Sequence, residues 1–110
     1  MEKEKKYLSD VLAAIELIRE FLLPIADFAT YQLDLKTKSA VERQLGIIGE
    51  AINKYRKLED QPSLKHDRQI IAFRNLLVHA YDNVDDTIVW AIVKTHLPEL
   101  REEVKFTLEQ

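Results

Sequence analysis

The chain has 110 residues, 46% of them hydrophobic and 32% charged, so it is long enough for one hydrophobic core but not for two. It has no cysteine, which excludes disulfides and thiolate zinc sites and favours a reducing cytoplasm. Its net charge of −3 argues against broad electrostatic binding to nucleic acid, although a small catalytic cleft needs only a few positive groups.

The sequence predicts neither a membrane segment nor a secretory signal. No apolar run approaches the ~18 residues of a membrane span. The start, MEKEKKYLSD, has mixed charge and no apolar stretch behind a basic patch. We therefore expect a single cytoplasmic domain, residues 1–110, with no membrane association.

The first half of the chain has helical periodicity. The chain contains two glycines and three prolines, and apolar and polar residues rarely alternate, so the prediction is all-α. Apolar residues at three- and four-residue steps predict a first helix from about Lys5 to Leu23, ended by Pro24. A short helical piece, Ile25–Gln32, is expected to follow.

A second long helix is predicted from Asp34 or Thr37, either of which could cap it, to about Leu58. The polar segment EDQPSLKHD (59–67) reads as a loop. The third helix is predicted over about Asp67–Ala80, with apolar positions at Ile70, Ile71, Phe73, Leu77 and Val78.

Asp85 is expected to cap a fourth helix that includes Ile88–Val93. Pro98 either kinks that helix or opens a fifth one, Pro98–Leu108. The predicted architecture is therefore an up-down antiparallel bundle of four to five helices.

Both glycines, Gly46 and Gly49, lie inside the second long helix, where each costs roughly 1 kcal/mol relative to alanine. One interpretation is that they open space beside Glu50 for a large partner such as an arginine. The alternative is tight helix packing, with Glu50 merely exposed at the surface.

The segment RNLLVHAY (74–81) places many hydrogen-bonding groups at the end of the third helix. Histidine titrates near neutrality, so His79 could exchange a proton with a ribose 2′-OH or a leaving oxygen. Arg74 would offer a planar fork of donors to phosphate oxygens, and Asn75 could hold the imidazole or bind the phosphate. These residue types suit metal-independent phosphodiester cleavage.

Spacing restricts how Arg74 and His79 could act together. They are five residues apart, which places them about 140° apart around one straight helix. They could converge if the arginine swings round, if the helix ends near His79, or across a two-fold dimer axis. A homodimer therefore enters the catalytic hypothesis.

Purely structural roles explain the same residues. An arginine–Glu50 ion pair, a histidine at a helix C-terminus and a packed Tyr81 would suffice. Metal catalysis is not predicted, because Asp82, Asp85 and Asp86 fall where a turn and a helix start use acids as caps.

RNLLVHAY resembles the signature of HepT-like toxins of the HEPN ribonuclease superfamily. ERQLGIIGEAI (42–52) resembles that family's second long helix, and YDNVDDTIVWAIVKTHLPEL (81–100) resembles its run from the motif into the last helices. The similarity extends over most of Val41–Leu100. A departure is His66-Asp67, where many relatives have Pro-Trp, which puts the packing of that loop and any substrate contact it makes in doubt.

The resemblance implies a small all-α homodimer with its active site at the dimer cleft, and leaves open whether the dimers assemble further. It implies a metal-independent endoribonuclease toxin without a cofactor, acting on RNA. It also implies an MntA-type nucleotidyltransferase antitoxin as partner, which transfers AMP to the tyrosine of the motif.

Carried onto this sequence, the resemblance makes Arg74 and His79 catalytic and Tyr81 the AMP acceptor. Asn75 and Glu50 would support them, with Glu50 positioning Arg74. Two alternatives remain: a non-catalytic, nucleotide-binding or partner subunit of a nucleotidyltransferase, and a helical interaction module without catalysis.

Overall fold

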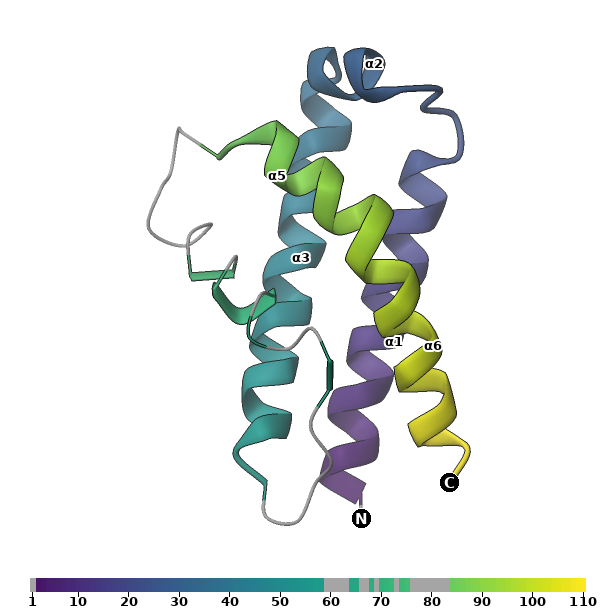
Figure 1. Ribbon diagram of the computed structural model, residues 1–110, viewed down its shortest axis with the longest axis vertical. Coiled ribbons are helices and arrows are strands. Elements are labelled where there is room, and N and C mark those ends of the chain that lie inside the picture. Colours follow the sequence, from purple (N-terminus) through teal and green to yellow (C-terminus); the bar gives the residue numbers. More distant parts are fainter. Residues whose placement is uncertain (1, 59–63, 66–67, 69, 73, 76–83) are drawn as a thin grey trace.

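The computed structural model describes residues 2–58, 64–65, 68, 70–72, 74–75 and 84–110 (Figure 1). All regular secondary structure in those ranges is helical, which confirms the all-α prediction. The helices are α1 (Glu2–Leu22), α2 (Phe28–Leu33), α3 (Leu35–Arg56), α5 (Asp86–Ala91), the π-helical segment η1 (Ile92–His96) and α6 (Leu97–Leu108). Residues 68, 70–72, 74 and 75 are also helical, within the third helix that the sequence predicts.

Helices α1 and α3 run side by side in opposite directions, and the α5–η1–α6 helix crosses them obliquely (Figure 1). Each presents an apolar stripe to the common core, and burying one such side chain contributes about 1.5–3 kcal/mol. The fully buried side chains include Leu8, Val11, Ile15, Ile18, Val41, Leu45, Ile48, Ile52, Leu100 and Val104. The predicted bundle is confirmed in these helices.

Capping by aspartates determines where α2 and α3 begin. The Asp27 side chain accepts a hydrogen bond from the Thr30 backbone N–H at 2.9 Å, so α2 starts three residues later than predicted. The Asp34 side chain accepts from the Thr37 backbone N–H at 3.0 Å and from its hydroxyl at 2.8 Å. Asp34 is therefore the cap of α3, and Thr37 lies inside the helix.

Pro98 lies in the first turn of α6, which begins at Leu97, within one residue of the predicted fifth helix, and η1 comes directly before it without a break. Proline lacks an N–H and its ring clashes with the carbonyl four residues earlier in an α-helix. In the wider π-helical turn of η1, backbone hydrogen bonds span five residues instead of four. The Leu97 N–H, for example, donates to the Ile92 carbonyl. Asp85 caps α5 through the Thr87 backbone N–H at 2.9 Å, as predicted.

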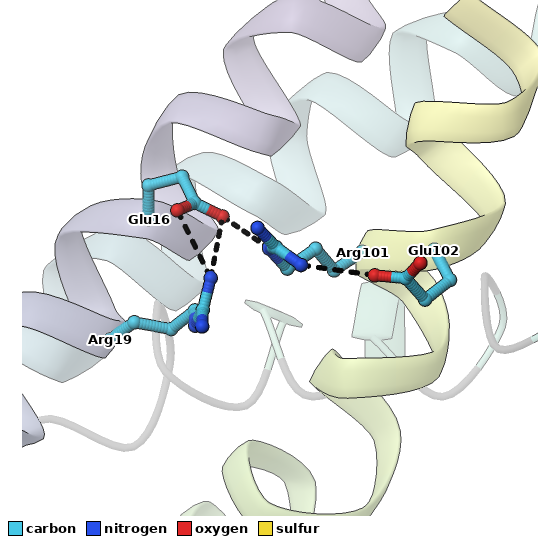
Figure 2. Close-up of polar contacts among 4 residues, drawn as sticks. All are labelled: Glu16, Arg19, Arg101 and Glu102. Atoms are coloured by element: carbon cyan, nitrogen blue, oxygen red, sulfur yellow. Dashed lines mark hydrogen bonds and ion pairs between the residues drawn. The ribbon is translucent and has the colours of Figure 1, made fainter.

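Two further contacts connect distant segments. Arg101 of α6 donates to Glu16 of α1, which also accepts from Arg19 at 3.2 Å (Figure 2). Leu64, in the segment predicted to be a polar loop, is buried in the core.

None of the described helices combines the length and apolar character that crossing a bilayer requires.

Candidate functional site

Arg74 lies against α3 at Gly49. A Cβ built on Gly49 would overlap the Cβ of Arg74 and would lie 2.7 Å from its Cγ and 3.2 Å from the Ile70 carbonyl oxygen. The absence of a side chain at Gly49 therefore permits the close crossing of the two helices. The expectation that the glycines make room for an arginine is confirmed at Gly49.

The same expectation is wrong for Gly46. A Cβ at Gly46 would have no described atom within 4 Å, so no packing among those residues requires glycine there. Gly46 instead lines an open groove beside Arg74.

The Arg74 guanidinium is oriented by two acceptors. Its Nη2 donates to Glu50 Oε2 in an ion pair, and its Nη1 donates to Asn75 Oδ1 at 3.2 Å. The side chains of Arg74 and Glu50 remain 30% and 44% exposed, so the ion pair is only partly covered. The predicted pairing of Glu50 with an arginine is confirmed, and Asn75 contacts that arginine.

The other motif residues singled out in the sequence, His79 and Tyr81, lie outside the described residues, as do His66, Asp67 and Asp82. Lys65, in the segment between α3 and the motif, contacts α6. Its Nζ pairs with Glu99 at 3.5 Å and its backbone N–H donates to Glu103 at 3.0 Å.

Arg74 lies at a groove of ≈930 Å³ that sequence inspection did not reveal. Five basic and three acidic side chains contribute to its lining, and α1 supplies part of the wall. The lining residues are Lys3, Lys6, Tyr7, Asp10, Ser39, Glu42, Arg43, Gly46, Ile47, Glu50, Ala51, Lys54 and Arg74. The lining residues of α3 recur at helical spacing around Glu50, so the sequence contained a pattern from which this part of the groove could have been predicted. The lining residues of α1 could not be predicted in this way, because they reach the groove only through tertiary packing.

A second cluster of charged side chains, N-terminal to Glu50 on α3, is more deeply buried than the pair of Arg74 and Glu50. Lys38 Nζ lies 2.7 Å from Asp86 Oδ2, and these side chains are 20% and 14% exposed. Burial raises the pKa of the Glu42 carboxyl above its ordinary value, and the nearby Asp86 carboxylate adds to the effect. Within the described ranges, no three histidine or carboxylate side chains gather closely enough to hold a metal ion.

Comparison with known proteins identifies the family of this chain. The family model described as "Ribonuclease HepT-like" matches residues 11–106, which include Glu50, Arg74 and Asn75. The chain belongs to the HepT-like ribonuclease family. The resemblance drawn from the sequence motifs is thereby confirmed.

Several HepT-like relatives match most of the chain. A probable ribonuclease HepT of Thermococcus cleftensis is 41% identical over 101 residues, which is 88% of each chain. A candidate RNase of Caldanaerobacter subterraneus is 30% identical over 111 residues, covering 100% of this chain and 98% of its own. A candidate RNase of Methanocaldococcus jannaschii is 32% identical over 105 residues, covering 92% and 93%. No solved structure matches the chain.

Proposed function

We propose that this HepT-like chain is the toxin of a toxin–antitoxin pair, a metal-independent endoribonuclease whose catalytic residues are Arg74 and His79. The observation that supports this most directly is the placement of Arg74. It is held by Glu50 and Asn75, is partly exposed, and lies at a groove with an excess of basic side chains. Family membership supports an RNA substrate.

In the proposed reaction, the ribose 2′-oxygen forms a bond to phosphorus as the bond from phosphorus to the 5′-oxygen breaks. His79 either accepts the proton of the 2′-OH while water protonates the leaving 5′-oxygen, or protonates the leaving oxygen while water accepts the proton of the 2′-OH. Arg74 binds the non-bridging oxygens and stabilises the charge that develops on them. Glu50 is a positioning residue, because it orients the guanidinium.

The active species is proposed to be a cytoplasmic homodimer. Arg74 and His79 are five residues apart, so one straight helix directs them about 140° apart. A two-fold axis beside the motif could bring an arginine of one protomer toward a histidine of its partner.

An MntA-type nucleotidyltransferase is the proposed antitoxin, acting by AMP transfer from ATP to the Tyr81 hydroxyl with release of pyrophosphate. The bulky, anionic AMP group would bind the Arg74 guanidinium, which would otherwise bind the RNA phosphate. Charge and steric exclusion would then inhibit the same site.

The decisive test is growth after induction of wild type, Arg74→Ala and His79→Ala in a host without the antitoxin. We expect only the wild type to arrest growth, and the purified wild type to cleave RNA in EDTA. If all three proteins form dimers and behave alike, catalysis by this pair is wrong. The protein would then be a non-catalytic partner of a nucleotidyltransferase.

The modification is tested with Tyr81→Phe. We expect this variant to remain toxic when an MntA-type antitoxin is co-expressed, whereas the wild type is neutralised and gains the mass of AMP. Neutralisation of the variant to the same degree would remove Tyr81 as the acceptor.

A further inference from the structure

Positive charge is concentrated on α3, although the whole chain carries a net charge of −3. The helix contains five basic and only two acidic residues. Two of the basic residues, Arg43 and Lys54, line the groove beside Arg74. A local cationic surface of this kind can bind an anion that the net charge would repel.

The groove follows α3 past Arg74. Arg43, Ile47, Glu50 and Lys54 lie at three- to four-residue steps, so they form one stripe on the helix. The stripe from Arg43 to Lys54 is about 16 Å long at the α-helical rise. Helix α1 packs along α3 and supplies further lining residues (Figure 1).

The five basic side chains of the groove outnumber its three acids, so part of its positive charge is not compensated within the groove. Glu50 is engaged by Arg74, and Asp10 pairs with Lys6 at 3.0 Å. Glu42, partly buried beside Lys38 and Asp86, is the one acid of the groove that remains against the three other cations.

The remaining cations, Lys3, Arg43 and Lys54, are exposed and form no ion pair with any described residue. Gly46 keeps this part of the groove open, because no described atom would contact a Cβ there. The groove thus combines unpaired positive charge with free space.

We propose that this groove, defined by Lys3, Arg43, Lys54 and Tyr7 beside Arg74, holds the phosphate backbone of single-stranded RNA next to the scissile bond. This proposal rests on the proposed function and extends it to a second set of residues. Proteins that bind single strands combine a basic groove along the backbone with aromatic side chains on which bases stack. The half-buried Tyr7 is the aromatic residue among those that line the groove, next to Lys6 in the chain.

The test uses a fluorescent 12-nucleotide RNA with 2′-O-methyl riboses, which lacks the nucleophilic hydroxyl and stays intact. Its affinity is measured by anisotropy at several salt concentrations for wild type and for Arg43→Gln/Lys54→Gln. The matched control, Lys36→Gln/Lys57→Gln, removes the same charge from exposed positions that do not line the groove.

Each phosphate contact contributes about 0.7 to the slope of log K against log salt for a single strand, so losing two contacts weakens binding ~25-fold at 0.1 M salt. We expect this loss and a slope reduced by about 1.4 in the groove variant, with wild-type binding in the control. Equal losses in both doubles, no loss in either, or no binding by the wild type would overturn the proposal. So would equally tight binding of duplex RNA, which would remove the single-strand assignment.

Failure of this proposal and of the proposed function are distinguishable. A wild type that binds the 12-mer through the groove but never cleaves ordinary RNA would refute catalysis and leave the groove standing. A wild type that cleaves RNA while the groove variant binds normally would refute only the groove.

Discussion

Replacing each glycine of α3 by alanine tests whether the contact between Gly49 and Arg74 determines how the two helices cross. Alanine gains roughly 1 kcal/mol over glycine inside a helix, and this gain applies at both positions. At Gly46 a Cβ meets no described atom, so Gly46→Ala should stabilise the protein by about that amount. At Gly49 the new Cβ overlaps the Arg74 stem and lies 3.2 Å from a backbone oxygen.

Overpacking of this kind costs typically 1–3 kcal/mol, and a backbone oxygen cannot move aside as a flexible side chain can. Gly49→Ala should therefore be less stable than Gly46→Ala by about 1–3 kcal/mol. For a domain of this size, about 2 kcal/mol corresponds to a gap of roughly 8 °C in Tm.

Both variants are suited to thermal and urea unfolding followed by the fluorescence of Trp90, the only tryptophan of the chain. Its ring packs against Tyr31, with centroids 5.2 Å apart, so it reports on the contact between α5 and α2. Equal stabilisation by the two alanines would refute the argument, because it would mean that Gly49 has space for a side chain.

Three further substitutions test the electrostatics around α3. Lys38→Met leaves the Asp86 carboxylate, 14% exposed, without its ammonium partner, and should cost about 1–3 kcal/mol at pH 7 in urea unfolding. Because burial raises the folded-state pKa of Glu42, its ionisation destabilises the fold as pH rises through that pKa; Glu42→Gln should therefore stabilise more at pH 7 than at pH 4. The Thr37 backbone N–H lowers the pKa of Asp34, so its capping contribution is present above the unfolded pKa of ~3.9 and lost as pH falls through the folded one. Asp34→Ala should lower Tm at pH 7, and the difference in Tm from the wild type should shrink as the pH falls below ~3.9.

The sequence was sufficient to predict the helices because each long helix carries its own apolar stripe and its own boundary residues. Asp34 and Asp85 cap the helices that follow them, and α1 ends at Leu22, just before Pro24. Capping and periodicity are local properties of the chain, so they can be read without knowing the tertiary structure.

The π-helical turn before Pro98 could not be read in the same way. The sequence says that a proline must disturb the preceding turn, but several adjustments satisfy that requirement. With the π-helical turn of η1 before the proline, Leu97 and Leu100 are buried in the core. Which adjustment of the helix occurs is therefore linked to how its side chains pack in the core. A single helix considered alone does not contain that information.

The candidate site likewise combines a feature that could be predicted from the sequence with one that depends on tertiary packing. Glu50 was predicted to pair with an arginine because two glycines beside it implied a close neighbour, and Gly49 fulfils that role. The lysines of α1 were missed because Lys3 and Glu50 are 47 positions apart in the sequence and meet only when α1 packs along α3.

The contact between Glu50 and Arg74 suggests why further basic side chains lie in the groove. Glu50 and Asn75 engage two of the five guanidinium N–H donors, which fixes the plane of Arg74 and leaves other donors for a phosphate. The same carboxylate lowers the positive potential at the site, and a partly exposed ion pair contributes little stability in return. A ribonuclease that orients its arginine in this way must attract its polyanionic substrate with other charges. Under the proposed function, the groove cations that form no ion pair with a described residue would meet that requirement, because they would attract the strand and leave the orientation of Arg74 undisturbed.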